Sequence, residues 1–206
     1  LICGHGCADT YVESYFLVLR SLRLNCEDSD RFWDARVSNA ELKMLLERIE
    51  KRAVEKIPTP YLLQEAWLID HPFYCDERVI IPRSYIAELL KDELAPWVSN
   101  PENVTRVLDL CTGSGCLGII AAEVFPNAKV DCVDISQDAL DVAKINVERY
   151  GMQDLIDLIK RDLFIELGAR QYDVIFSTPP FLTQVPMDNL PDVPLPEPDI
   201  TMGPGH

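Results

Sequence analysis

A glycine-rich segment between two apolar runs has the composition of a ligand-binding loop. Residues 109–118 read Asp-Leu-Cys-Thr-Gly-Ser-Gly-Cys-Leu-Gly and connect a strand-like run at 104–110 to a helix-like run at 117–125. Glycines at such a junction let the backbone approach a ligand closely. Asp134 ends the next apolar run, about 20 residues further on, where a carboxylate accepts hydrogen bonds from both hydroxyls of a ribose. The spacing predicts a nucleoside-bearing cofactor at the carboxyl ends of neighbouring strands.

The same glycines leave two classes of cofactor open. Gly113, Gly115 and Gly118 also match the dinucleotide fingerprint, so a nicotinamide enzyme has to be considered. Asp109 stands four residues before Gly113, where its carboxylate would repel a pyrophosphate and would attract the ammonium group of an amino acid. Charge therefore favours S-adenosyl-L-methionine.

Two further residues complete the expected cofactor site. Asp162 follows the apolar run at 155–159 and can accept a hydrogen bond from the exocyclic amine of adenine, while Leu163 can pack on the ring. The residues expected to bind the cofactor are Asp109, Thr112, Gly113, Ser114, Gly115, Asp134, Asp162 and Leu163.

A proline pair follows the apolar run at 172–176, at the sheet edge where the cofactor is expected. Prolines stiffen a loop and leave carbonyl groups free to accept hydrogen bonds. An amide or aromatic amine is a poor nucleophile because its lone pair is delocalised, so its methylation needs acceptors for its N–H groups and an aromatic wall beside its plane. A Pro-Pro-Phe sequence alone is more often a turn, and its position favours the functional role. The expected catalytic residues are Thr178, Pro179, Pro180 and Phe181.

Apolar runs that alternate between strand and helix spacing predict an α/β fold with a mainly parallel, doubly wound sheet. Parallel strands end at one edge of a sheet, so this order brings the glycine loop, Asp134 and the proline pair together. The expected strands are residues 104–110, 130–133, 155–159 and 172–176, and the expected helices are residues 117–125 and a segment that Ser136 caps and Gly151 ends.

The N-terminal part has helical spacing. Ser38 and Glu41 form a capping box for a helix that Pro58 and Pro60 are expected to end. The expected apolar faces are Val12, Tyr15, Phe16, Leu19 and Leu22 in residues 9–24, and Leu42, Leu45, Leu46 and Ile49 in the second helix. The expected domains are a helical accessory domain at 1–62, a hairpin linker at 63–83 with strands at 66–69 and 78–81, and an α/β domain at 84–206 that opens with a helix ending at Pro96.

These motifs, with segments further upstream, resemble the protein-glutamine methyltransferases that also modify release factors, and in particular the branch acting on the large-subunit ribosomal protein L-three. The resemblance implies methylation of a glutamine side-chain amide nitrogen by S-adenosyl-L-methionine. It also implies that residues 1–62 recognise the substrate and that further strands follow His206, so that the chain is a fragment. The segments that carry the resemblance are the glycine loop, Asp134, Arg161-Asp162-Leu163-Phe164, Pro179-Pro180-Phe181, Gly4-His5-Gly6, Ile57-Pro58, Tyr61-Leu62, Glu65-Ala66-Trp67, Pro72-Phe73-Tyr74, Asp76-Glu77-Arg78-Val79 and Pro82-Arg83-Ser84.

The chain departs from the family pattern beside the expected amide site. Thr178 stands where the family has Asn, whose side chain would both accept from and donate to the glutamine amide, and a threonine has only one hydroxyl for both contacts. Phe181 replaces Tyr and lacks its hydroxyl, and Tyr85 stands where the branch usually has Pro. Two alternatives therefore stay open, a DNA adenine amino methyltransferase and a cofactor-binding module with impaired catalysis.

The composition favours a protein partner. Counting 34 Asp and Glu against 19 Lys and Arg gives a net charge of -15, which disfavours nucleic acid and suits a basic ribosomal protein. No apolar run reaches the length of a membrane span. Seven cysteines, an odd number, indicate reduced thiols and a cytoplasmic protein. Cys3, His5 and Cys7 lack a second pair of metal ligands, so no metal site is expected.

Overall fold

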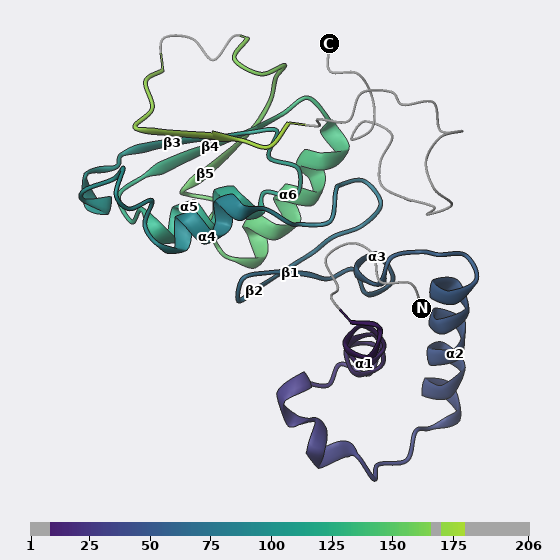
Figure 1. The fold of residues 1–206 in the computed structure, drawn as a ribbon. Coiled ribbons are helices and arrows are strands. Elements are labelled where there is room, and N and C mark those ends of the chain that lie inside the picture. Colours follow the sequence, from purple (N-terminus) through teal and green to yellow (C-terminus); the bar gives the residue numbers. More distant parts are fainter. Residues whose placement is uncertain (1–8, 166–169, 180–206) are drawn as a thin grey trace. The chain divides into compact units, whose positions relative to one another are not determined.

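The computed structural model describes residues 9–165 and 170–179 (Figure 1). They form two compact units that divide between Glu65 and Ala66. The smaller unit is helical, and the larger unit contains a hairpin and a parallel sheet with its helices. Each unit has its own buried residues and is described by itself.

The two predicted helices of the smaller unit begin at the predicted residues. Asp9 caps the first helix by accepting a hydrogen bond from a backbone N–H, and Ser38 and Glu41 make the predicted capping box. The elements are α1 (Thr10–Ser21), the 3-10 helix η1 (Cys26–Phe32), α2 (Asn39–Ala53) and α3 (Thr59–Leu63). The prediction that Pro58 and Pro60 end the second helix is wrong. It ends at Ala53, and Pro60 lies in the first turn of α3, where a missing N–H costs no hydrogen bond.

The interior of the smaller unit contains an ion pair that the apolar spacing did not indicate. Glu13 of α1 accepts hydrogen bonds from Nε of Arg52 at 2.7 Å and from Oγ1 of Thr59 at 2.8 Å, and all three residues are buried. This pairing fixes which face of α1 is inside. Leu17 is therefore buried, whereas Val12 of the predicted face is 55% exposed.

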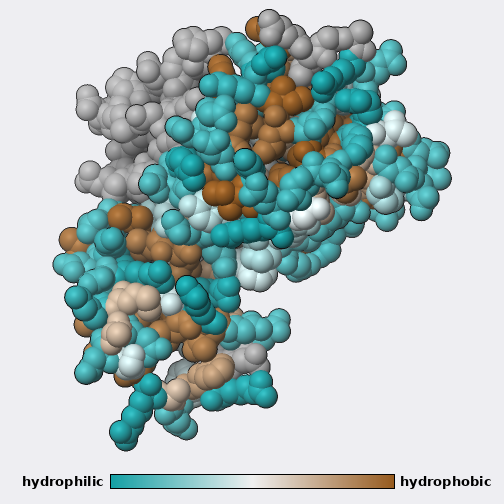
Figure 2. Space-filling model, turned by 180° about the vertical axis from the view of Figure 1, so that it is seen from behind, coloured by the Kyte–Doolittle hydropathy of each residue, from teal (hydrophilic) through white to brown (hydrophobic). Residues whose placement is uncertain are grey.

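Large hydrophobic side chains stay at the surface of the smaller unit (Figure 2). Of the stripe predicted for α2, Leu45 is buried, while Leu42, Leu46 and Ile49 are exposed. A helical unit this small supplies little apolar surface to cover such a stripe.

The larger unit is built on a four-stranded parallel sheet in the order β5-β4-β3-β6. The predicted parallel α/β fold is confirmed. Its strands are β3 (Arg106–Leu110), β4 (Lys129–Asp134), β5 (Ile156–Lys160) and β6 (Val174–Ser177), and its helices are α4 (Tyr85–Lys91), η2 (Pro101–Asn103), α5 (Cys116–Val124) and α6 (Gln137–Arg149). The bounds of the four strands, of α5 and of α6 lie within a few residues of their predictions.

The connections place a ligand site at one edge of this sheet. The chain proceeds outward from β3 through β4 to β5 and then returns to the other side of β3, so the strand order reverses between β3 and β6. Helices α4, α5 and α6 lie together on one side of the sheet (Figure 1). Ligands of open parallel sheets bind outside the carboxyl ends of the strands at such a reversal.

The main core of the larger unit lies between the sheet and the helices. Its largest fully buried side chains include Phe73, Leu90, Val107, Ile119 and Phe125. Each such side chain contributes about 1.5–3 kcal/mol when it leaves water. This core keeps the ends of β3 and β4 fixed beneath the glycine loop.

The hairpin is shorter than predicted. β1 (Ala66–Leu68) pairs with β2 (His71–Phe73) in antiparallel register, and Trp67 lies opposite Pro72. The prediction of a second strand at 78–81 is wrong, because the Asp76 carboxylate accepts the backbone N–H of Arg78 and turns the chain there.

The helix that follows also ends early. Ser84 caps α4 as expected for its start, but the helix ends at Lys91 and not at Pro96. Glu93 and Leu94 have positive φ angles of 56° and 55°, a left-handed conformation that no α-helix contains. Among the described residues, no helix combines the length and the apolar character that a membrane span requires.

Candidate functional site

A cavity of about 580 Å³ lies at the carboxyl ends of β3, β4 and β6. Small-molecule sites in proteins have volumes of about 300–1,000 Å³, so it can hold a nucleoside-sized ligand. Its walls come from the glycine loop, the end of β4, the residues after β6 and the segment 78–86. The expected site residues that line it are Thr112, Gly113, Ser114, Asp134, Thr178 and Pro179.

The glycine loop is held by backbone hydrogen bonds and has left-handed residues on both sides of Ser114. The N–H of Thr112 donates to the carbonyl oxygen of Val133 at 3.1 Å, and the N–H of Gly115 donates to that of Thr112 at 3.0 Å. Gly113 and Gly115 have φ angles of +55° and +77°, which strongly favour glycine. The loop therefore reaches the N-terminus of α5 in a tight turn.

The three glycines of the motif serve different ends. A Cβ at Gly115 would lie 3.1 Å from the Cβ of Ala143, and a Cβ at Gly118 would collide with the Sγ of Cys132. Nothing lies within 4 Å of a Cβ position at Gly113, which lines the cavity. Gly115 thus allows the loop to pack closely on α6, Gly118 allows α5 to pack closely on β4, and Gly113 leaves space for a ligand.

Asp109 lies beneath the loop, fully buried at the end of β3. Its Oδ2 accepts hydrogen bonds from Oγ1 of Thr112 at 2.5 Å and from the N–H of Gly118 at 3.1 Å. Burial raises the pKa of Asp109 to about 7, the two hydrogen bonds oppose that rise, and the nearby charge of Asp134 adds to it. Its other oxygen, Oδ1, is buried without a hydrogen-bond partner in the described part of the chain.

Asp134 ends β4 and forms part of the cavity wall. Its Oδ2 accepts the N–H of Gly113 at 2.9 Å, and its Oδ1 accepts the N–H of Ser136 at 2.9 Å. Each carboxylate oxygen keeps a further lone pair. The residue thus ties the loop to the start of α6 and still presents acceptors to the cavity.

Thr178 and Pro179 lie on the opposite side of β3 from β4, directly after β6. The backbone N–H of Thr178 donates to the carbonyl oxygen of Leu110 at 3.3 Å, and its hydroxyl lies 3.4 Å from the carbonyl oxygen of Cys111. Pro180 and Phe181 lie outside the described residues. The two described residues of the predicted motif, Thr178 and Pro179, therefore lie next to the glycine loop.

Four of the expected cofactor residues are not in the cavity wall with the others. Asp109 lies beneath the loop, and Gly115 belongs to the loop but faces Ala143 of α6. Asp162 and Leu163 follow β5, and neither lines the cavity, while the Leu163 side chain is 44% exposed. Their roles beside adenine remain predictions.

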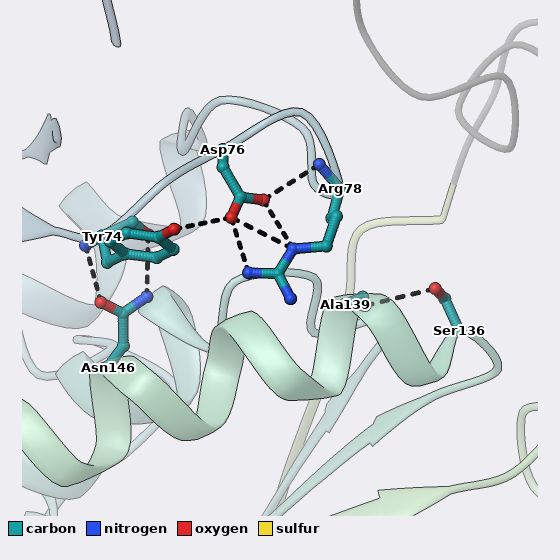
Figure 3. A network of polar contacts seen from close by, with 6 residues as sticks. All are labelled: Tyr74, Asp76, Arg78, Ser136, Ala139 and Asn146. Atoms are coloured by element: carbon teal, nitrogen blue, oxygen red, sulfur yellow. Dashed lines mark hydrogen bonds and ion pairs between the residues drawn. The ribbon is translucent and has the colours of Figure 1, made fainter. Parts of the chain in front are cut away.

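The sequence analysis did not predict that residues 78–86 form a second wall of the cavity. This segment contributes the charged side chains of Arg78 and Arg83, and only the family resemblance had pointed to it. Figure 3 shows Asp76 between Tyr74 and Arg78: the Tyr74 hydroxyl donates to Asp76 Oδ2 at 2.8 Å, and Arg78 Nη2 donates to the same oxygen at 2.6 Å. Burial raises the pKa of Asp76, but the hydrogen bonds from Arg78 and Tyr74 outweigh it and hold that pKa below its usual value. The sequence signal that could have indicated this wall is the spacing of Asp76 and Arg78, two residues apart, shortly before the helix cap at Ser84.

Asn146 of α6 joins this wall to the glycine loop. It is fully buried, and its side chain exchanges two hydrogen bonds with the backbone of Tyr74, at 2.7 Å and 3.0 Å (Figure 3). It also donates to the carbonyl oxygen of Ser114 at 2.9 Å. An asparagine inside a helix gave no sign of this role in the sequence.

The thiols near the cavity are neutral groups. Burial raises the pKa of Cys111 and raises that of Cys116 to about 12. Thiolates are the nucleophilic form of cysteine, so these side chains act as small apolar fillers. No metal-ligating cluster occurs among residues 9–165 and 170–179, and Cys3, His5 and Cys7 lie outside them.

The chain is similar to methyltransferases. It matches the Methyltransferase small domain family over residues 88–190. It is 48% identical to the ribosomal protein uL3 glutamine methyltransferase of Bordetella pertussis, over 98% of this chain and 68% of that protein. It is 47% identical to the protein of the same name from Burkholderia pseudomallei, over 100% of this chain and 69% of that one. A crystal structure of the SAM Dependent Methyltransferase from Agrobacterium tumefaciens is 25% identical, with a TM-score of 0.44, over 56% of this chain and 39% of that one.

Proposed function

Because the chain belongs to the family of the ribosomal protein uL3 glutamine methyltransferases, we propose that it methylates the side-chain amide nitrogen of a glutamine in ribosomal protein uL3. The observation that carries this proposal is one cavity shared by the glycine loop, Asp134 and the Thr178-Pro179 corner. A cofactor loop and an amide-holding corner are thereby within reach of one ligand. The family sets the nicotinamide alternative aside.

S-adenosyl-L-methionine is the cofactor of this fold, and the cavity fits it. Asp109 lies beneath the glycine loop, and its Oδ1 is a buried acceptor without a partner among the described residues. A buried unpaired acceptor is costly, so we propose that the ammonium group of the cofactor pairs with it. Gly113 leaves open space where a ligand can approach the backbone. Asp134 has lone pairs for the ribose hydroxyls, and we keep Thr112, Ser114, Asp162 and Leu163 as further contacts of the cofactor.

The cofactor supplies an electrophilic methyl group, and the chain's own residues prepare the amide that receives it. The Thr178 hydroxyl donates to the carbonyl oxygen of Cys111, so its lone pairs are available to accept an N–H of the glutamine amide. That contact raises electron density on the amide nitrogen. Pro179 restricts the backbone beside it, and we propose that Pro180 and Phe181 hold the plane of the amide. Positioning of this kind, without a strong base, provides much of the rate.

The rest of the proposal concerns recognition. We propose that residues 1–62 bind the protein substrate, that 63–83 link them to the methyltransferase domain at 84–206, and that the reaction occurs in the cytoplasm. A net charge of -15 would attract a basic ribosomal protein and repel nucleic acid. The exposed hydrophobic side chains of α2, Leu42, Leu46 and Ile49, are suited to such a contact.

The test is mass spectrometry of recombinant uL3 incubated with S-adenosyl-L-methionine and the full-length protein. The expected result is a single methyl group on one glutamine, absent when the cofactor is left out. Methylation of adenine in a DNA substrate, with uL3 unchanged, would contradict the proposal. Binding of the cofactor with no transfer to uL3 would instead support the binding-module alternative.

A further inference from the structure

Asp76 fixes the plane of the Arg78 side chain. Arg78 Nε donates to Asp76 Oδ1 at 2.9 Å, Nη2 donates to Oδ2 at 2.6 Å, and the backbone N–H of Arg78 donates to Oδ1 at 3.1 Å. A two-point pair between a guanidinium and a carboxylate sets the orientation of both groups. The guanidinium is therefore oriented before a ligand binds.

The residues that hold Arg78 are also connected to the glycine loop. Asp76 receives the Tyr74 hydroxyl, the backbone of Tyr74 is held by Asn146, and Asn146 donates to the carbonyl oxygen of Ser114. Because the buried Asn146 contacts both Tyr74 and Ser114, the position of Arg78 is fixed relative to the loop. Figure 3 shows the contacts that run from Asn146 through Tyr74 and Asp76 to Arg78.

One edge of the Arg78 guanidinium is available. Its Nη1 makes no hydrogen bond within the described ranges, and Figure 3 shows this nitrogen pointing away from Asp76. Arg78 lines the cavity, and its side chain is 34% exposed. The other charged residues of the described wall are Arg83, which is engaged in a further interaction, and Asp134.

The charge of the chain makes such a cation necessary for an anionic group. At a net charge of -15, a carboxylate entering the cavity meets an unfavourable field from the protein as a whole. A guanidinium with a free N–H edge offsets this locally through a charge-assisted hydrogen bond. Asp109 and Asp134 can attract the ammonium and ribose groups of the cofactor, and neither can bind its carboxylate.

We propose that Arg78 binds the carboxylate at the amino-acid end of the methyl donor, with Asp76, Tyr74 and Asn146 as the residues that position it. This inference rests on the proposed function, since it assumes S-adenosyl-L-methionine in the cavity. In this role, Arg78 distinguishes cofactors that carry the carboxylate from nucleosides that lack it.

The experiment compares two ligands by isothermal titration calorimetry on the full-length protein without any protein substrate. S-adenosylhomocysteine carries the carboxylate, and 5′-methylthioadenosine keeps the nucleoside and the thioether but lacks the amino-acid end. Arg78→Gln should weaken binding of S-adenosylhomocysteine by about 10- to 100-fold and change binding of 5′-methylthioadenosine by less than about twofold. Arg78→Lys, which keeps the charge without the fork, should fall between.

Two further variants keep the test decisive. Arg78→Gln leaves the buried Asp76 carboxylate without its cationic partner. The double variant Asp76→Asn/Arg78→Gln, which is neutral at both positions, should therefore show the same loss of ligand preference if the single variant folds poorly. Lys144→Gln removes one positive charge from an exposed site on α6, where the side chain is 66% exposed. It should bind both ligands as the unaltered protein does.

The outcomes separate this inference from the proposed function. If the unaltered protein binds neither ligand, both are overturned. If it binds S-adenosylhomocysteine and the Arg78 variants bind it equally well, only the role of Arg78 is overturned. A raised KM for the protein substrate with unchanged cofactor affinity would likewise overturn it, because the carboxylate or carbonyl bound by Arg78 would then belong to the substrate.

Discussion

Asn146 donates a hydrogen bond to the carbonyl oxygen of Ser114 at 2.9 Å, although 32 residues separate them. The same side chain pairs with the backbone of Tyr74, which lies 72 residues away. Three chain segments thus meet at one amide group with no solvent exposure. Buried polar groups are costly when they lose their partners, so the arrangement of both cavity walls depends on this residue.

Asn146→Ala is expected to lower the free energy of unfolding by about 2–4 kcal/mol, because it leaves backbone groups of Ser114 and Tyr74 buried and unpaired. Cofactor affinity should fall as well, since both walls lose their common support. Urea unfolding and calorimetry measure the two effects. Asn127→Ala is the matched control, because Asn127 makes an exposed hydrogen bond to the carbonyl oxygen of Glu102 and should cost less than about 1 kcal/mol. Equal losses in the two variants would contradict the role of Asn146.

Asp109 should make the stability of the cofactor-free protein depend on pH. Burial raises its pKa from 3.8 in the unfolded chain to about 7 in the folded protein, so the folded state binds the proton more tightly. The resulting stabilisation is complete below about pH 4 and is lost as the pH rises towards 7. Asp109→Asn has no such proton, and its stability should fall less over this range.

Urea unfolding of both proteins at several values between pH 4 and pH 8 measures that difference. All other ionisable groups are common to the two proteins, so the difference in slope isolates Asp109. A cationic ligand beside Asp109 should lower its pKa and release a proton on binding. Parallel slopes for the two proteins would show that the carboxyl is not desolvated as the structure indicates.

Gly118 is expected to be intolerant of even a methyl group. In Gly118→Ala the new Cβ would collide with the Sγ of Cys132 on β4, and overpacking of this kind costs about 1–3 kcal/mol. Gly151→Ala is the control, since Gly151 has a φ of +67° with nothing within 4 Å of the Cβ position, so only backbone strain of about 1–2 kcal/mol is expected there.

A second substitution tests the cause of the Gly118 effect. Cys132→Ala removes the sulfur that the new methyl group would meet, so the double variant Gly118→Ala/Cys132→Ala should be more stable than the sum of the single effects predicts. Thermal unfolding of the three variants measures this coupling. Strict additivity would mean that Gly118 is needed for a reason other than its contact with Cys132.

The sequence predicts the parts of the site that depend on local backbone chemistry. The capping serine at Ser136, the glycines of the loop and the carboxylate of Asp134 lie where the spacing puts them, because strand, turn and helix follow from neighbouring residues. The second strand of the hairpin was predicted at the wrong residues. Val79 and Ile81 are buried but lie outside any strand, and a buried loop segment can have the same apolar pattern as a strand.

The second wall of the cavity could not be predicted in this way. A bidentate contact with Asp76 holds Arg78 in this wall. Asn146 joins the wall to Ser114, which is distant in the sequence. Such contacts arise only when distant segments pack, and a single buried asparagine leaves no periodic signal in the sequence. Likewise, the pairing of Glu13 with Arg52 buries a charged side chain of α1 that does not belong to its apolar stripe.

Thr178 is the remaining residue whose effect on the reaction can be separated from cofactor binding. Its hydroxyl donates to the carbonyl oxygen of Cys111 and is left as an acceptor, so it can receive an amide N–H but cannot at the same time donate to the carbonyl of the glutamine. Thr178→Val keeps the shape and removes the acceptor. We expect kcat for uL3 methylation to fall by about 10- to 100-fold, with cofactor affinity unchanged.

Thr178→Asn should act in the opposite direction, because a carboxamide supplies a donor and an acceptor on separate atoms. The expected result is a higher kcat, with the same affinity for S-adenosylhomocysteine, measured by methyl incorporation into uL3 and by calorimetry. If the unaltered protein is already as fast as the Asn variant, and Thr178→Val is equally fast, the hydroxyl has no part in holding the amide. Activity that appears only with Asn at this position would identify the Thr178 protein as a cofactor-binding module.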